Sequence, residues 1–495
     1  MNNKKNAISS LVLQVATIVQ GLILPKLILG SFGSEVNGLI SSITQFLSFI
    51  SLLEGGLGAV VLAELYGPIE KKDDKKIQGV LDACQSFFSK LTVVFLVYTV
   101  LVALFYPRYI DASLSKGAVS ILVLILSMTT VAQYLFSITY RLLLQAEQKL
   151  YIVNYVSTVT ILINTISAAI IIFVFPSIHV VKFCSGIIYM IQPMAYKTFV
   201  EKKFLKGNIQ KKKQHYTLKN RWSGFAQNFA HFVNMNTDVA LITFFMPLQY
   251  VSVYSVHLLV INALRGIVTS VGNSYQSALG KYIAMGDSFQ LKQKFRKFEE
   301  GFWLAGMILF FCCALLINPF IQIYTVGITD AEYYQPIFSF IMVLANMFYV
   351  IREPYRLLVL SGGKFKETNF GAFAEAIINL GMSLLFITKF GLIGVALGTL
   401  VAITFRLIYL VWYLHKDIIQ ISYASFFPFI ITFIVTFAVN LFVYISWPLR
   451  LNSIVQFIIA GFIVFVAECG VCYFVYWVNR RIFQVINSWL FRTTH

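Results

Sequence analysis

Long apolar stretches, separated by short segments rich in Pro, Gly or charge, constrain this chain more than any other feature. Of its 495 residues, 58% are hydrophobic and only 12% are charged, whereas a soluble domain has about 25% charged residues. About 20 consecutive apolar residues are enough for a helix to cross a bilayer. Fourteen such stretches occur, at about 7–29, 36–65, 79–106, 117–144, 151–175, 178–199, 222–247, 250–283, 299–324, 335–362, 367–388, 391–415, 425–447 and 453–478. The sequence therefore predicts an all-α polytopic membrane protein with about fourteen transmembrane helices.

The basic residues predict the orientation of these spans. If the N-terminus is cytoplasmic, the cytoplasmic segments hold 28 of the 39 Lys and Arg residues, and the outer loops hold five. Positive charge accumulates in cytoplasmic loops of membrane proteins, so this bias predicts an even number of spans with both termini in the cytoplasm. Lys4 and Lys5 precede a first span that is too long for the apolar region of a cleavable signal peptide. The first helix is therefore expected to remain as an anchor.

The longest polar stretch divides the chain. A basic cytoplasmic linker at 201–221 separates an N-terminal lobe of six spans (1–200) from a C-terminal lobe of six spans (222–416), and two further spans form an appendage at 417–495. Each lobe begins with a span, a very short outer turn and an overlong helix. Two lobes around a site near the membrane midplane are a common transporter architecture.

We single out twelve ionisable side chains inside the predicted spans. A charge at bilayer depth is costly unless it faces a water-filled cavity, a partner or a ligand, so such residues are candidates for function. The basic ones are Lys26, Lys90, Arg265, Arg352, Arg356 and Arg406; the acidic ones are Glu54, Glu64, Asp238, Glu353, Glu375 and Glu468. The guanidinium groups indicate a polar cargo that is anionic.

Three of the arginines share one depth. Arg265, Arg352 and Arg406 each lie some 15 residues from the outer end of a span, at roughly 22–26 Å depth at about 1.5 Å per helical residue. A guanidinium suits a phosphate because its planar fork makes two parallel hydrogen bonds and stays protonated. These three are therefore candidate substrate-binding cations, expected to line a water-accessible cationic cavity between the two lobes. Arg356 and Lys26 are further candidates, but both lie near the ends of their spans, where side chains can instead extend to the lipid interface.

The acidic residues and the helix breakers complete the candidate site. Glu54 reaches a similar depth in the other lobe, and Asp238 and Glu375 come nearer the midplane. Each could pair with an arginine or carry a coupling proton, and pairing is the more common role. Pro354 is expected to kink its helix beside Arg352.

Other functional classes leave no signature in the sequence. A Gly-x-x-x-x-Gly-Lys-Ser/Thr loop is absent, so no built-in ATPase is expected. We find no cluster of His, Cys and carboxylates with metal-ligand spacing, and we expect no metal, no cofactor and no catalytic residues. The net charge of +18 fits basic cytoplasmic loops and anionic lipid headgroups; without a basic soluble domain, nucleic acid is not an expected partner.

Several motifs resemble those of a known transporter family. They match, in order and spacing, bacterial flippases for polysaccharide repeat units, the Wzx-type polysaccharide transporter branch of the multidrug/oligosaccharidyl-lipid/polysaccharide (MOP) exporter superfamily. The resemblance covers nearly the whole chain. The segments that carry it are Leu53–Gly58 with Leu65–Ile69, Arg352–Arg356 with Ser361–Thr368, and Glu375–Asn379 with Lys389–Thr399.

The resemblance implies a fold, an activity and a location. The fold would be two six-helix MATE-like lobes, arranged as a V, with two extra C-terminal helices. The activity would be translocation of an undecaprenyl-pyrophosphate-linked oligosaccharide to the outer leaflet of the bacterial inner membrane by alternating access, with polysaccharide polymerase machinery as a possible partner. Motif position supports roles for Glu54, Arg352 and Arg356, whereas for Lys26, Arg265 and Arg406 only the depth argument does.

Two alternatives stay open. A cation-coupled multidrug exporter of the same fold predicts an acidic cavity for cationic drugs, which the arginines within the spans oppose. A membrane-embedded glycan polymerase or glycosyltransferase predicts a large outer loop or a cluster of catalytic carboxylates, and the sequence has neither.

Overall fold

The structure, a computed structural model, describes residues 2–203, 216, 225–417, 426–446, 449 and 451–492. Seventeen helices and the turns between them make up this part of the chain, in which no strand occurs. Most of the predicted basic linker at 201–221 lies outside the described residues. The predicted boundaries of the two lobes and of the C-terminal appendage therefore remain a prediction.

Within the described residues, twelve apolar helical segments are long enough to cross a membrane, which confirms the predicted polytopic all-α class. The difference from fourteen has two sources. The first two predicted spans fall within one apolar segment, Lys4–Glu54, which Gly33 divides into two helical parts, and the seventh appears as a shorter apolar helix, Phe232–Phe245.

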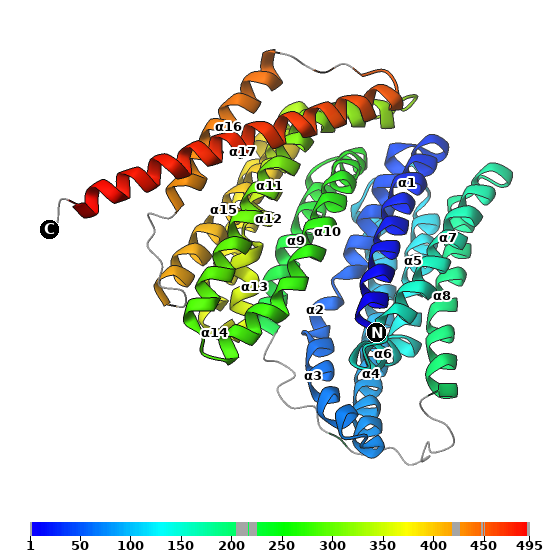
Figure 1. Ribbon diagram of the computed structural model, residues 1–495. Helices are drawn as coiled ribbons and strands as arrows, with labels where there is room; N and C mark the ends of the chain where they lie inside the picture. The colour runs from blue at the N-terminus through cyan, green and yellow to red at the C-terminus, as the bar shows by residue number, and fades with distance from the viewer. Residues whose placement is uncertain are drawn as a thin grey trace. The chain divides into compact units, whose positions relative to one another are not determined.

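The described helices gather into two compact units. Unit 1 comprises residues 1–255 together with 328–331, and its helices α1 and α4–α8 pack side by side (Figure 1). Its helices are α1 (Asn2–Ser48), α2 (Ser51–Glu54), α3 (Leu57–Glu70), α4 (Asp74–Tyr109), α5 (Lys116–Phe136), α6 (Ile138–Ala146), α7 (Leu150–Val174), α8 (Ile178–Lys203), α9 (Phe225–Phe245) and the first two turns of α10 (Leu248–Ala284).

Unit 2 comprises residues 256–327 and 332–495. Its long last helix, α17, packs across α11 and α16 (Figure 1). Besides the remainder of α10, its helices are α11 (Ser288–Tyr324), α12 (Pro336–Ile351), α13 (Glu353–Ser361), α14 (Phe365–Phe390), α15 (Leu392–Asp417), α16 (Phe427–Ser446) and α17 (Ile454–Arg492).

Gly33 divides α1 at the turn predicted between the first two spans. Its φ of 82° and ψ of 173° are not helical, and φ values in this range favour glycine. The helix restarts with a cap from a distant loop, because the carboxylate of Asp330 accepts hydrogen bonds from the backbone N–H and the hydroxyl of Ser34, both at 2.6 Å. A side chain at Gly33 would place its Cβ 2.8 Å from the Asp330 carboxylate. This contact attaches the segment 328–331 to unit 1.

The predicted second span is also broken. Gly55 and Gly56 have φ values of 58° and 79°, and they separate α2 from α3. Two successive left-handed residues cannot continue a right-handed helix, and glycine adopts them without a Cβ clash. Glu54 therefore lies at the end of one short helix rather than inside a continuous one.

Helices α14 and α15 pack with their backbones in close contact. Gly394 and Gly398, four residues apart on α15, face α14. A Cβ at Gly398 would lie 2.5 Å from the backbone N and 2.8 Å from the Cα of Ser383, and one at Gly394 would lie 2.8 Å from the backbone N of Ile387. Small residues at this spacing let membrane helices approach closely. The close approach brings the charged residues of these two helices together.

We expect Gly398→Ala to destabilise the protein by about 1–3 kcal/mol, the usual cost of forcing extra volume into a packed interface. The matched control is Gly381→Ala on α14, where an added Cβ meets nothing within 4 Å; alanine there should be neutral or slightly stabilising because it favours helix. Thermal unfolding in detergent measures both. Equal melting temperatures for the two variants would show that the α14–α15 interface is looser than its geometry indicates.

Candidate functional site

Arg352 lies in a helix break inside the predicted tenth span. Helix α12 ends at Ile351 and α13 begins at Glu353, with Pro354 in its first turn. Proline has no backbone N–H to continue the helical bonding pattern, so the break lies where the sequence placed a kink. The Arg352 side chain is buried with only 4% of its surface exposed. A buried guanidinium requires partners, and these are Glu375 on α14 and the ring of Tyr349 on α12.

Glu375 on α14 joins two of the predicted arginines. Nη1 of Arg352 donates a short hydrogen bond to Oε1 of Glu375, and Nε of Arg406 lies 3.5 Å from Oε2 of the same carboxylate. Arg406 also donates to the backbone carbonyl of Thr368 at 3.1 Å. Gly371 makes room for this arrangement, because a Cβ there would collide with the Arg406 guanidinium. One carboxylate thus balances two buried cations.

Tyr349 joins the third arginine to the group. The guanidinium carbon of Arg265, on α10, lies 3.8 Å from the centre of the Tyr349 ring, and that of Arg352 lies 4.4 Å from it. The ring face is electron-rich and attracts cations. Arg265 is half-buried, whereas Tyr349 is buried. The guanidinium of Arg265 is therefore held in place while part of it stays accessible.

Arg356 is held one turn after the helix break. Its Nε donates to Oε2 of Glu353 at 2.8 Å, and its Nη2 donates to Oε1 at 2.5 Å. Glu353 is 1% exposed, but the Arg356 side chain is 39% exposed. This bidentate pair anchors an accessible guanidinium.

We call the following seven residues the arginine cluster: Arg265, Tyr349, Arg352, Glu353, Arg356, Glu375 and Arg406. All belong to unit 2. Four guanidiniums outnumber two carboxylates, so the cluster is formally cationic. Arg265 and Arg356 are its accessible members, whereas Arg352 and Arg406 are buried against Glu375. The arrangement suits an anionic ligand that approaches through the accessible pair.

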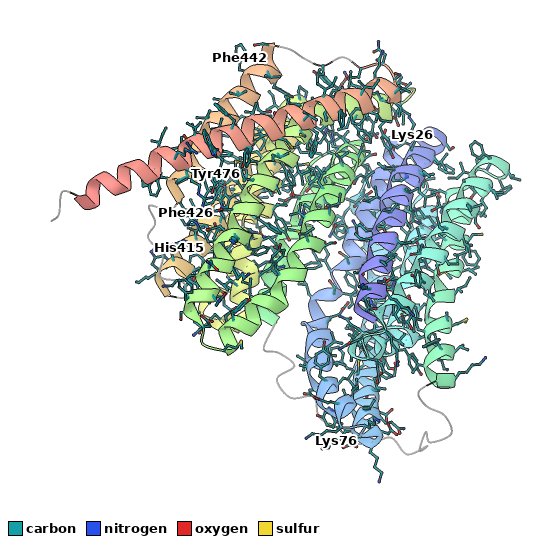
Figure 2. All side chains as sticks on the ribbon, in the orientation of Figure 1. Lys26, Lys76, His415, Phe426, Phe442 and Tyr476 are labelled. Carbon is teal, nitrogen blue, oxygen red and sulfur yellow. The ribbon has the colours of Figure 1, made fainter. Side chains whose placement is uncertain are left out.

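The remaining predicted site residues belong to unit 1. Lys26 is half-buried on α1 and lies toward the opposite end of the unit from Lys76 (Figure 2). Glu54 accepts a hydrogen bond of 2.6 Å from the hydroxyl of Tyr134, and buried Asp238 accepts one of 2.8 Å from that of Tyr254. Both carboxylates thus have tyrosine partners, and a coupling role for either remains a prediction.

The sequence reasoning missed Tyr349. Two signals in the sequence could have found it. Tyr349 precedes Arg352 by three residues, and residues at that spacing share a helix face. An aromatic ring is also a frequent neighbour of a buried guanidinium. Glu353 was recognised only as a charge inside a span, although its spacing of three residues from Arg356 is the spacing of a helical ion pair.

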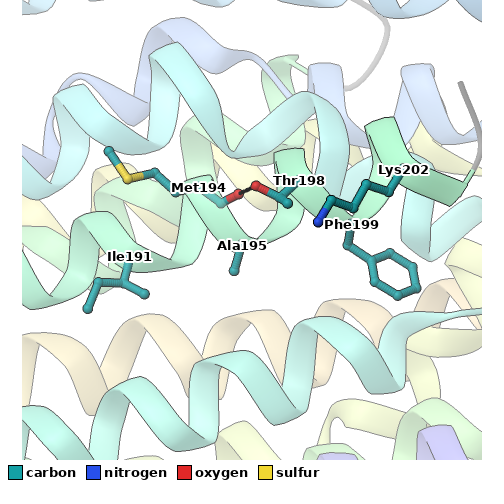
Figure 3. Close-up of a pocket in the computed structure, with 6 residues that line it drawn as sticks. All are labelled: Ile191, Met194, Ala195, Thr198, Phe199 and Lys202. Atoms are coloured by element: carbon teal, nitrogen blue, oxygen red, sulfur yellow. Dashed lines mark hydrogen bonds between the residues drawn. The ribbon is translucent and has the colours of Figure 1, made fainter. Parts of the chain in front are cut away.

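A hollow of about 710 Å³ runs along α8 (Figure 3). The described residues that line it are Ile191, Met194, Ala195, Thr198, Phe199 and Lys202. Thr198 donates its hydroxyl hydrogen to the carbonyl oxygen of Met194 at 2.8 Å, and Lys202 is the one charged side chain among these residues. This lining suits an apolar group better than a diphosphate. Within the part of the chain that the structure describes, no group of three or more His, Cys, Asp or Glu side chains could hold a metal ion.

Comparison with known proteins identifies the fold. No protein-family model matches the sequence, and no curated protein does. A structure of the lipid II flippase MurJ in an inward closed conformation aligns with a TM-score of 0.69 over 97% of this chain and 98% of that one, at 15% identity. The eukaryotic MATE transporter AtDTX14 aligns with a TM-score of 0.58 over 84% of this chain and 94% of its own, at 13% identity.

A third solved structure, an inward-facing multidrug resistance MATE family transporter of the MOP superfamily, aligns with a TM-score of 0.50. It covers 82% of this chain and 97% of that one, at 12% identity. The chain therefore has the polytopic helical fold shared by MurJ and the MATE transporters. The Wzx-type resemblance and the nature of the cargo are not established by similarity at this level.

Proposed function

We propose that this protein is a flippase that moves an undecaprenyl-pyrophosphate-linked oligosaccharide from the inner to the outer leaflet of a bacterial inner membrane. The observation that carries the proposal is the arginine cluster, in which four guanidiniums and two carboxylates lie within apolar spans. A net cationic group at membrane depth is costly, and an anionic substrate would offset that cost. A diphosphate is the anion that a lipid-linked sugar would bring into the membrane.

The two pairs of arginines have different roles in this proposal. Arg265 and Arg356 are accessible and would contact phosphate oxygens, because guanidinium–phosphate pairs form strong, oriented hydrogen bonds. Arg352 and Arg406 would hold Glu375 and Tyr349 in position behind them. Tyr349 would keep Arg265 from turning toward the lipid interface. We propose further roles for three residues in unit 1 during alternating access. Lys26 would bind the substrate, and Glu54 and Asp238 would carry a coupling proton or pair with a cation.

The comparisons with solved structures support a transporter, and the resemblance of the motifs supports the Wzx-type branch. MurJ is a lipid II flippase, and that cargo is stated of MurJ alone. For this chain we propose a cargo of the same chemical class, a sugar joined through phosphate to a polyprenyl tail. The sugar would be a polysaccharide repeat unit. We further propose that both termini are cytoplasmic, which a reporter fused after His495 would test.

The decisive experiment is transfer between leaflets in vesicles. Purified protein is reconstituted with an undecaprenyl-pyrophosphate oligosaccharide, and the appearance of the glycan on the opposite face is followed by its accessibility to a lectin or glycosidase. We expect transfer that depends on the protein, without transport of a cationic dye such as ethidium. Dye transport without glycan transfer would favour the multidrug exporter and contradict the proposal.

A further inference from the structure

A polar hollow of about 350 Å³ lies on one face of α4 in unit 1. Asp82, Gln85, Ser86, Ser89, Lys90 and Val93 line it, at spacings that put them on a single helix face. The hollow contains both a carboxylate and an ammonium. It is not part of the arginine cluster, and no role considered above uses it.

The same face becomes apolar directly beyond the hollow. Val93, Val97, Val100 and Leu104 follow Lys90 at steps of three or four residues, and each is at least 50% exposed. The polar and apolar halves therefore form one continuous surface along the helix. A ligand that fits this surface is polar at one end and apolar along its length.

The position of the hollow along α4 matches the membrane boundary. Residues 91–107 contain no charged side chain, and Lys90 and Arg108 bound this uncharged run. At 1.5 Å per residue their Cα atoms are about 27 Å apart, close to the ~30 Å of a hydrocarbon core. Lys90 is thus at the edge of the core rather than deep within the span predicted at 79–106, and Asp82 lies two turns farther out, at headgroup depth. Helical side chains lean toward the helix N-terminus, so Lys90 extends over Ser86 toward that layer.

The polar groups of the hollow differ in their availability. The amide of Gln85 is already engaged, because it donates to the carbonyl of Leu135 at 2.7 Å and accepts from the hydroxyl of Thr139 at 2.8 Å. Lys90 is exposed and makes no hydrogen bond or ion pair with the rest of the described chain. An ammonium at the edge of the hydrocarbon core is stabilised by an anionic partner. A phospholipid phosphate is the anion present at that depth.

We infer that this face of α4 is a binding site for a phospholipid whose headgroup carries both a phosphate and a primary ammonium, the phosphatidylethanolamine type. Lys90 and the hydroxyls of Ser86 and Ser89 bind the phosphate. The Asp82 carboxylate attracts the ammonium, and the acyl chains lie along the valine stripe that begins at Val93. Asp82 decides the headgroup, because its charge repels a lipid with a net negative charge.

The test measures which lipid stays with the protein. Full-length protein is incorporated into nanodiscs of equal parts phosphatidylethanolamine and phosphatidylglycerol and extracted in mild detergent, and the retained lipids are quantified by mass spectrometry. We expect wild-type protein to retain phosphatidylethanolamine preferentially. Lys90→Ala should reduce its retention about tenfold, the scale of one lost charge-assisted hydrogen bond. The matched control is Lys76→Ala, near the N-terminal end of the same helix (Figure 2). This variant should retain as much phosphatidylethanolamine as the wild type.

A second variant tests the headgroup separately. Asp82→Asn keeps the shape of the side chain and should shift the preference toward phosphatidylglycerol, because the repulsive charge is removed. Monodispersity and melting temperature confirm that each variant is folded, and Lys90→Gln replaces Lys90→Ala if the latter is not. Retention of phosphatidylglycerol by the wild type, or equal lipid ratios in the wild type, Lys90 and Asp82 variants, would overturn the inference.

Discussion

Glu375→Ala is expected to destabilise the folded protein by about 3–5 kcal/mol, the range observed when one partner of a buried ion pair is removed. Glu375 is the carboxylate that contacts both Arg352 and Arg406, which are 4% and 6% exposed. Removing it leaves two guanidiniums buried with less compensating charge. The measurement is unfolding in detergent, by heat or by titration with a denaturing surfactant.

The control is another glutamate on the same helix. Glu367 pairs with Lys364 at 3.3 Å, but both side chains are largely exposed, at 44% and 50%. Exposed ion pairs contribute about 0–1 kcal/mol, so Glu367→Ala should leave stability nearly unchanged. Similar losses for Glu367→Ala and Glu375→Ala would contradict the role given to the buried carboxylate.

A combined replacement separates stability from function. Changing Glu375 to Leu together with Arg352 and Arg406 to Met exchanges the buried charges for apolar side chains of comparable size. Such exchanges are often neutral or stabilising, so stability should recover relative to Glu375→Ala. Transport should not recover, because the charged side chains of Arg352, Arg406 and Glu375, which position Tyr349 and through it Arg265, are no longer present.

The sequence predicted the helices and their breaks where the cause is local. Apolar length marks the spans, and proline marks the break beside Arg352. The kink at Gly33 depends on a cap from Asp330, 296 residues away in the sequence, and no local pattern reports such a contact.

The candidate site was partly predictable for the same reason. Depth along a helix is a local property, and it grouped Arg265, Arg352 and Arg406, whose side chains do converge around Tyr349 and Glu375. Rotation about the helix axis decides which of them are accessible, and this depends on packing against other helices. The depth argument treated the three arginines alike, whereas the structure leaves Arg265 half-exposed and buries the other two. Whether they bind substrate stays a prediction.

Arg265→Glu is expected to abolish glycan transfer in the vesicle assay, and Arg265→Ala should slow it by about ten- to a hundredfold. The ordering follows from charge: alanine removes one attractive contact of about 1.5–3 kcal/mol, whereas glutamate adds repulsion of the diphosphate where the local dielectric constant is low. Arg265→Lys should restore part of the rate, because it returns the charge and the contact with Tyr349 but not the bidentate fork.

The matched control is Arg480→Ala. Arg480 is also in unit 2 and pairs with Glu300 at 3.1 Å, but its side chain is 48% exposed and it lies outside the arginine cluster. Its loss should leave transfer unchanged. Tyr349→Phe keeps the ring face and should also transport normally, whereas Tyr349→Leu should resemble Arg265→Ala, because the guanidinium loses the surface that holds it. Equal transfer by the Arg265→Ala and Arg265→Glu variants at matched expression would mean that Arg265 only anchors α10. The proposal of an anionic cargo would then lose the support of this accessible cation.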